Sequence, residues 1–337
     1  MRRDASLGTQ SNAVRVALSA DMMCAMKLRV FSAVLISMLS WTGLGCTTRN
    51  QDARPSPDAA SPEADSGLLT EDAGIPRADG GQRPPSSDCT ERARWIYLVD
   101  SNNAFLRFEP DSGSITPIGS LSCTRDGRPF SMAVNRHADA FVLHSDHRIY
   151  RVSTADASCS PTDFAPDQMG FELFGMGFVS QSEGSNIEHL FVAGGPAANV
   201  GRGSSTLGQI DPSAWALTSI APVSGSPELS GTGTGELWGF FPDGSRMTVR
   251  QLDKSSGGTL REIDVSSIDP YRFGPPEAWA FAAWGGRFYL FYQGSFDLST
   301  CIYRVTPDTG AIETIEQDIG YRIVGAGVST CAPTILF

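Results

Sequence analysis

Five charged residues occupy the same position in five similar segments of the chain, and their side chains are of kinds that bind ions or sugars or transfer protons. Each stands three residues before a short strand of mostly small residues, and together they are Arg128, Glu172, Glu228, Glu277 and Arg322. Three carboxylates close together suit Ca²⁺, which prefers several oxygen ligands. Two suitably spaced carboxyls suit glycosidase-type acid/base catalysis. The structural alternative is a set of ion pairs that orient neighbouring segments.

The segments that carry these residues share one plan. A strand of small residues is followed by an aromatic or β-branched strand, and then by a strand, a turn and a further strand. The apolar residue before the turn recurs at intervals of 44, 58, 42 and 53 residues, at Phe108, Val152, Ile210, Leu252 and Val305. Short strands at this spacing, with no long amphipathic helix pattern, predict an all-β domain.

The two ends of the repeated region complete each other. The first segment has no strand of small residues before it, and the last such strand, at Gly325, has no segment after it. We therefore expect the C-terminal strand to pair with the strand that begins near Trp95 and to close a ring. Five units with this circular completion predict a five-bladed β-propeller. The five charged residues, called the collar below, then surround one mouth of its central channel.

The strands of small residues are predicted to be the innermost strands, which crowd around the axis. Positions i and i+2 of a strand share a face, and in "GMGF" and "GAGV" these positions are glycines. We expect the small face of one blade to receive larger side chains from its neighbour.

Several segments of the sequence resemble those of a known group of proteins. The stretches "PELSGTGTGELWGFF", "PEAWAFAAWGGRFYLFY" and "GYRIVGAGVSTCAPT" are similar to uncharacterised bacterial lipoproteins with β-propeller-type repeats. The resemblance spans most of residues 92–337 and implies the fold and an export route. It implies no activity.

The N-terminal region predicts export and a lipid anchor. Lys27 and Arg29 precede 16 mostly apolar, uncharged residues that end at Gly45, a length typical of a secretory signal and short for a membrane-spanning helix. Cys46 follows, and the pattern resembles a bacterial lipoprotein signal that is cleaved before a lipidated cysteine. A plain secretory signal or an uncleaved anchor is the alternative. By analogy with other bacterial lipoproteins, Thr47 favours the outer membrane.

Four parts of the chain follow from these patterns. Residues 1–25 are interpreted as a mis-called extension upstream of a true start at Met26, and residues 26–45 as the signal peptide. Residues 46–88 contain the lipidated cysteine and a tether with six prolines and eight acidic residues after it, a composition that cannot offset chain entropy by burial. Residues 89–337 form the predicted propeller.

The cysteines predict a covalent lock. Seven are present, and five remain after Cys24 of the upstream extension and the lipidated Cys46 are set aside; exported cysteines are expected to pair. Cys89 precedes the first strand and Cys331 ends the last, so a Cys89–Cys331 bridge would close the ring where its ends meet. Cys123, Cys159 and Cys301 are not assigned by the sequence, with Cys123–Cys159 the preferred pair.

Two further motifs predict no site of their own. His144 and His147 lie in "HSDH" without other metal ligands at a suitable spacing, and a solvated loop is the preferred interpretation. The glycine-rich stretch at 194–205 lacks the residues of a phosphate loop and is interpreted as a surface insertion.

Together these patterns favour a tethered, non-catalytic propeller that acts as a ligand-binding or protein-interaction/scaffold module for a protein or glycan, with the collar as the candidate binding site and no cofactor apart from the Ca²⁺ alternative. The other candidate is a carbohydrate-active hydrolase, or a Ca²⁺-dependent sugar-binding propeller, that uses Glu172, Glu228 and Glu277. The net charge of −11 disfavours nucleic acid, whose partners present a basic face.

Overall fold

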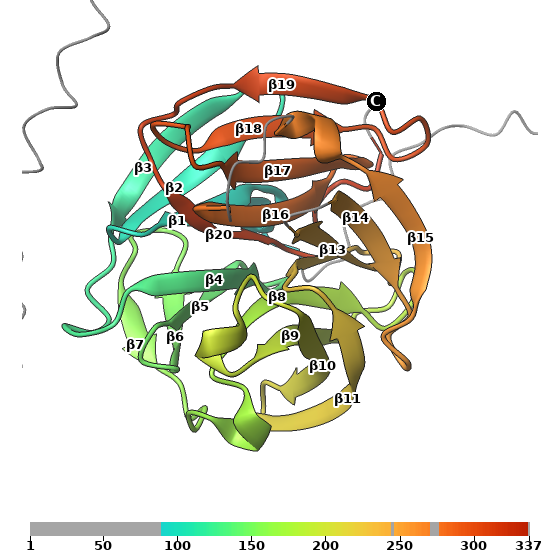
Figure 1. Cartoon of the computed structure of the whole chain (residues 1–337). Helices are drawn as coiled ribbons and strands as arrows, with labels where there is room; N and C mark the ends of the chain where they lie inside the picture. Colours follow the sequence, from blue (N-terminus) through green and yellow to red (C-terminus); the bar gives the residue numbers. More distant parts are fainter. Residues whose placement is uncertain (1–88, 244–245, 270–275, 336–337) are drawn as a thin grey trace, which may run out of the picture. The chain divides into compact units, whose positions relative to one another are not determined.

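In the computed structural model, the described residues are 89–243, 246–269 and 276–335. They contain five four-stranded antiparallel sheets arranged as the blades of a β-propeller (Figure 1). The predicted signal, lipidation site and tether lie outside the described residues. Among the described residues, no helix is long and apolar enough to cross a membrane.

The blades, named A to E in ring order, are built as follows. Blade A contains β20 (Ile323–Val328), β1 (Ile96–Asp100), β2 (Ala104–Glu109) and β3 (Ser114–Ser120). Blade B contains β4 (Pro129–Val134), β5 (Asp139–His144), β6 (Ile149–Ser153) and β7 (Cys159–Pro161). Blade C contains β8 (Leu173–Ser180), β9 (Glu188–Gly195), β10 (Ser204–Asp211) and β11 (Ala216–Ser224). Blade D contains β12 (Glu228–Gly231), β13 (Leu237–Pro242), β14 (Met247–Leu252) and β15 (Thr259–Asp264). Blade E contains β16 (Ala278–Trp284), β17 (Arg287–Gln293), β18 (Cys301–Val305) and β19 (Ile312–Glu316).

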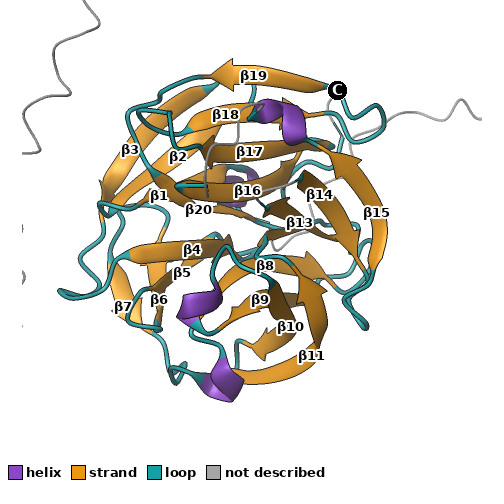
Figure 2. Cartoon of the chain, viewed as in Figure 1, coloured by secondary structure: helices purple, strands orange, loops and turns teal. Residues whose placement is uncertain are grey.

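Between the strands, the helical elements of the described region are single 3₁₀ turns (Figure 2). They are η2 (Glu91–Arg94), η3 (Gln168–Gly170), η4 (Ala197–Asn199) and η5 (Ser266–Ile268).

The predicted closure of the ring is confirmed. Strand β20 pairs antiparallel with β1, with Ile96 opposite Val328 and Leu98 opposite Ala326. Blade A therefore takes its innermost strand from the C-terminal end of the domain and its other three strands from the N-terminal end, as Figure 1 shows in the contrasting colours of β20 and β1.

The hydrophobic core is divided among the seams between blades. Five clusters of buried side chains are present, and each draws its residues from two neighbouring blades. At the D–E seam the rings of Trp238 and Phe288 have centroids 4.6 Å apart. At the E–A seam Phe108 meets Tyr289 edge to face at 5.6 Å. Because each core is shared, no blade buries its apolar faces alone.

The innermost strands approach one another more closely than the sequence predicts. A Cβ atom at Gly175 of β8 would overlap the backbone at Pro227 and Glu228, and one at Gly177 would come within 3.0 Å of the Cα of Ser230. The small face of β8 thus receives the backbone of β12. The expectation that a small face receives larger side chains is wrong for β8, but at Gly327 of β20 the nearest atom to an added Cβ would be Cγ2 of Val134 in blade B, at 2.7 Å.

Both predicted disulfides are present. Cys89–Cys331 joins residues 242 positions apart, with Cα atoms 5.7 Å from each other, and Cys123–Cys159 joins the loop before β4 to strand β7. Cys301 is the free cysteine of the described region and is buried.

Candidate site at the mouth of the central channel

The collar residues do not share one environment, because they do not share one place relative to the strands. Arg128, Glu172, Glu277 and Arg322 each lie one residue before an inner strand, whereas Glu228 is the first residue of β12. Pairing of Glu228 with Phe240 fixes its backbone within the sheet. The other four residues lie in the connections that enter the blades.

Glu277 and Arg322 form an ion pair between blades E and A. Oε2 of Glu277 lies 3.5 Å from Nη2 of Arg322, and both side chains are more than two-fifths exposed. Arg128, also exposed, uses its backbone N–H to donate to Oγ of Ser145 at 2.9 Å. The Glu277–Arg322 contact is an inter-blade ion pair, whereas the Arg128 contact is a hydrogen bond from its backbone within blade B.

Glu172 holds the glycine-rich insertion of blade C. Its Oε2 accepts a hydrogen bond of 2.9 Å from the backbone N–H of Ala197, the first residue of η4. The carboxylate is therefore engaged with backbone at the base of the insertion, and the insertion contributes Pro196, Asn199 and Val200 to the wall of the mouth.

Glu228 is the one collar residue that is fully buried. Its side chain is 3% exposed, and its Oε2 accepts a hydrogen bond of 2.8 Å from Oγ of Ser131. Ser131 belongs to blade B and Glu228 to blade D, so this bond passes across the ring and skips blade C. Burial raises the pKa of the Glu228 carboxyl well above its ordinary value of 4.5, against a smaller opposing effect of the Ser131 hydroxyl. Burial thus favours the neutral form of the acid.

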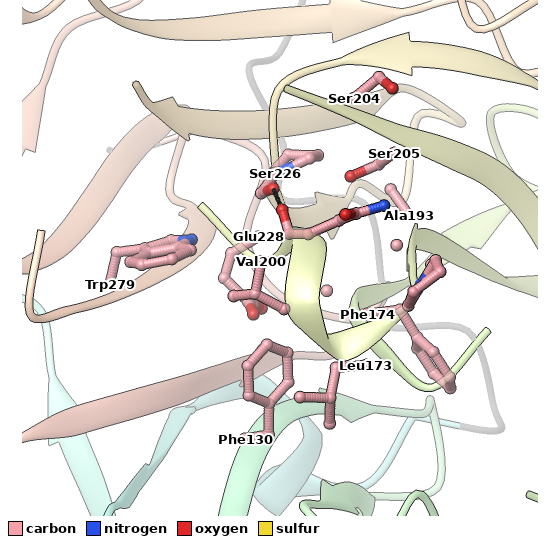
Figure 3. Close-up of a pocket in the computed structure, with 16 residues that line it drawn as sticks. Phe130, Leu173, Phe174, Ala193, Val200, Ser204, Ser205, Ser226, Glu228 and Trp279 are labelled. Atoms are coloured by element: carbon pink, nitrogen blue, oxygen red, sulfur yellow. Dashed lines mark hydrogen bonds between the residues drawn. The ribbon is translucent and has the colours of Figure 1, made fainter. Parts of the chain in front are cut away.

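The mouth is narrow and mostly apolar. Figure 3 shows Glu228 among Phe130, Leu173 and Trp279, which come from blades B, C and E. The free space inside is about 20 Å³, room for about one water molecule. Glu228 is the single charged residue in its wall. A mechanism with two carboxyls therefore lacks its second group at this cavity.

The described residues contain no group of three or more His, Cys, Asp or Glu side chains placed to hold a metal ion. The three collar carboxylates are each bound to a different partner, as described above.

The two histidines of the "HSDH" motif have different surroundings. His144 ends β5 and is 1% exposed, with its ring edge-on to Tyr150, and burial lowers its pKa. His147 lies 2.7 Å from Oδ1 of Asp167. The prediction of a solvated loop is wrong for His144, because β5 continues to this residue and pairs it with Pro129.

The connection between β17 and β18, beside the collar, carries a second feature that the sequence did not predict. The connection between β17 and β18 displays Phe296 and Leu298, which are 75% and 89% exposed. Gln293, the last residue of β17, accepts a hydrogen bond from the N–H of Glu277, so the connection stands beside the Glu277–Arg322 pair. Phe296 and Leu298 are called the apolar tip below.

The apolar tip has a fixed backbone. Oδ2 of Asp297 accepts a hydrogen bond of 2.7 Å from the N–H of Gly294. Oδ1 of Asp318 accepts from the N–H groups of Leu298 and Ser299, at 3.1 and 3.3 Å. The signal in the sequence is two large apolar residues inside a polar connection, "GSFDLST".

Known proteins resemble this chain only at low sequence identity. No protein-family model matches the chain, and no curated protein matches it. Among solved structures, a Bacteroides caccae protein of unknown function aligns at 13% identity and a TM-score of 0.35, over 65% of this chain and 71% of that one. TolB from Acinetobacter baumannii aligns at 11% identity and a TM-score of 0.41, over 66% of this chain and 52% of that one. A luciferin-regenerating enzyme aligns at 11% identity and a TM-score of 0.41, over 68% of this chain and 74% of that one.

Proposed function

We propose that this chain is an exported propeller, tethered to the cell envelope through a lipid on Cys46, and that it binds a partner protein without catalysing a reaction. The observation that carries the proposal is the apolar tip: two large side chains, 75% and 89% exposed, are held out by a connection whose backbone is fixed by Asp297 and Asp318. Exposed aromatic and aliphatic side chains on a fixed backbone are typical anchors of protein interfaces.

The charges around the tip indicate the kind of partner. Asp297 and Asp318 flank the two apolar side chains, and the whole chain carries a net charge of −11. A partner with an apolar pocket bordered by lysine or arginine matches this surface in shape and charge. An anionic membrane surface matches it poorly, because the same carboxylates would face like charge.

The state of the channel mouth favours binding over catalysis. Each collar carboxylate is engaged with a partner inside the domain, and the cavity beside Glu228 has room for about one water molecule. Of the alternatives left open by the sequence, the carbohydrate-active hydrolase and the Ca²⁺-dependent sugar site both require carboxylates that converge, and these carboxylates do not.

Photocrosslinking in the native envelope tests the interaction. A photoreactive residue at position 296 or 298 of the full chain is expected to give one crosslinked protein product, and the same residue at Leu260, an exposed apolar position on β15 of blade D, is expected to give none. With the purified partner, Phe296→Ser/Leu298→Ser is expected to weaken binding by about tenfold or more, and Leu260→Ser to leave it unchanged.

Two results would contradict the interaction. Equal crosslinking from positions 296 and 260 would show that the tip has no special role. Binding of the purified full chain to neutral or anionic lipid vesicles, lost in the tip variant, would assign the tip to a membrane instead. The anchor is tested separately by mass spectrometry of the mature protein, which is expected to begin with a diacylated Cys46.

A further inference from the structure

We infer that the seam between blades A and B contains a binding site for a small organic oxyanion, a ring-bearing carboxylate, phosphate or sulfate. This groove, called the A–B groove, is distinct from the channel mouth and from the apolar tip. Its free space is about 230 Å³, compared with about 20 Å³ at the mouth. Its lining consists of Arg92, Trp95, Tyr97, Arg107, Thr116, Ile118, Thr154 and Ala155.

The charge of the lining is entirely positive. Arg92 and Arg107 are its charged members, in a chain whose net charge is −11. Both guanidinium groups act on the Tyr97 hydroxyl electrostatically. Guanidinium groups match carboxylate and phosphate oxygens in geometry as well as in charge.

Arg107 is held in the wall of the groove by two contacts. Its Nη2 binds Oε1 of Glu109 at 2.7 Å, and its guanidinium lies 4.9 Å from the centre of the Trp95 ring. Its Nε is buried and has no hydrogen-bond partner. Because this nitrogen is closed off from the groove, an anion there would meet the terminal nitrogens of the guanidinium instead.

Two carboxylates lie near the groove and interact with its arginines. Glu109 competes with a ligand for Arg107, and Asp156 interacts with Arg92 electrostatically. Neither carboxylate lines the groove itself. The apolar faces of Trp95 and Ile118 provide a surface for a ring, so we expect an anion carried on a ring to bind more tightly than a free inorganic anion.

Blade E offers a matched control for Arg107. Arg304 of β18 pairs with Tyr289 in the same register as Arg107 of β2 pairs with Tyr97, and it forms a similar ion pair, with Glu313 at 2.6 Å. The residue of β17 that corresponds to Trp95 of blade A is Arg287. Arg304→Gln therefore removes an equivalent arginine without touching the A–B groove.

Calorimetric titration of the full chain with phenyl phosphate, benzoate and inorganic phosphate tests the site. We expect at least one ring-bearing anion to bind at millimolar concentration or below. Arg107→Gln should weaken that binding roughly tenfold or more, and the exposed Arg92→Gln by about three- to tenfold. Arg304→Gln should leave it unchanged.

Three outcomes would overturn the inference. They are no binding of any of these anions by the parent chain, an equal loss of binding in Arg304→Gln and Arg107→Gln, and binding of inorganic phosphate as tight as that of phenyl phosphate. Because Arg92 is exposed in η2, its variant tests the site even if Arg107→Gln fails to fold. The tip variant Phe296→Ser/Leu298→Ser should bind the anion normally, so this site and the proposed protein interaction succeed or fail independently.

Discussion

The two ends of the central channel are closed by different means. At the end opposite the collar, called the clasp end, the Cys89–Cys331 disulfide lies against Arg136, whose carbonyl oxygen is 3.7 Å from Sγ of Cys331. Glu188 accepts hydrogen bonds there from the N–H of Arg136 and the hydroxyl of Thr330, at 3.0 and 2.8 Å. At the collar end one hydrogen bond crosses the ring, from Ser131 to Glu228, and one exposed ion pair joins blades E and A.

We propose that the clasp end contributes more to stability and the collar end more to binding. At the clasp end the disulfide joins the two ends of blade A, and Glu188 of blade C bonds to Arg136 of blade B and to Thr330, which follows β20 of blade A. The collar end has an exposed ion pair and displays the exposed Phe296 and Leu298. The following predictions test whether stability depends mainly on the clasp end.

The largest effect is expected from the disulfide. Cys89→Ser/Cys331→Ser should lower the free energy of unfolding by about 5.5 kcal/mol in the chain-entropy treatment, because the bridge closes a loop of 242 residues. Chemical denaturation of the parent and the variant measures the difference, with Cys301→Ala as the matched control that removes a thiol without removing a bridge. A loss below about 1 kcal/mol would mean that the ring is held by β-pairing and the seam cores alone.

A smaller loss is expected from Glu188→Ala. The substitution leaves the N–H of Arg136 and the hydroxyl of Thr330 without their acceptor, at about 1–3 kcal/mol for buried groups of this kind. Denaturant titration checks the value, and Glu188→Gln, which keeps one acceptor oxygen, should lose less. Equal losses in the two variants would argue against the hydrogen bonds as the cause.

At the collar end, Glu228→Gln should change the pH dependence of stability more than its magnitude. The folded-state pKa of Glu228 is raised by burial above 4.5, so the folded state binds the proton more tightly than the unfolded state. The stability that protonation of Glu228 contributes is fully present below about pH 4.5 and is lost as the pH rises through the raised folded pKa. Gln does not titrate, so the variant loses no stability over this pH range. It should therefore gain stability relative to the parent as the pH rises.

Denaturation of the parent and Glu228→Gln at pH 4, 6 and 8 measures this trend. Glu188, whose pKa burial also raises, is present in both proteins and cancels in the comparison. A difference in unfolding free energy that does not vary with pH would show that Glu228 titrates normally.

The smallest effect is expected from the exposed ion pair. Arg322→Gln should change the free energy of unfolding by less than about 1 kcal/mol, as exposed pairs usually do, and the small effect should shrink further as salt is added. Thermal melts at low and high salt check it. A loss as large as that of Glu188→Ala would place a principal lock at the collar end and remove the contrast between the two ends.

The parts of the fold that follow from repetition were predictable from the sequence. Pairing of β1 with β20 and the Cys89–Cys331 disulfide follow from counting strands and placing cysteines at their ends, whereas Cys123–Cys159 was only the preferred pair among three unassigned cysteines. The environment of each collar residue was not predictable in this way. Glu228 enters a strand one residue earlier than its four counterparts, and a bulge between Pro129 and Ser131 shifts blade B, so equal spacing in sequence does not give equal burial.

The apolar tip and the A–B groove escaped the sequence pattern for a related reason. Both depend on positions that the repeats do not share: the connection after β17 in blade E, and Trp95 and Arg92 at the entry to blade A. Alignment of the five segments highlights what they have in common, while these features arise where one blade differs from the others.

The origin of β20 has a consequence for biosynthesis. Strands β1 to β3 leave the ribosome long before residues 323–331, and at roughly 5–20 residues per second the delay is on the order of tens of seconds. During that interval the edge of β1 that later receives β20 has no native partner, and such an edge is prone to pair with other chains. Until residues 323–328 are made, this edge of β1 therefore stays open to non-native pairing.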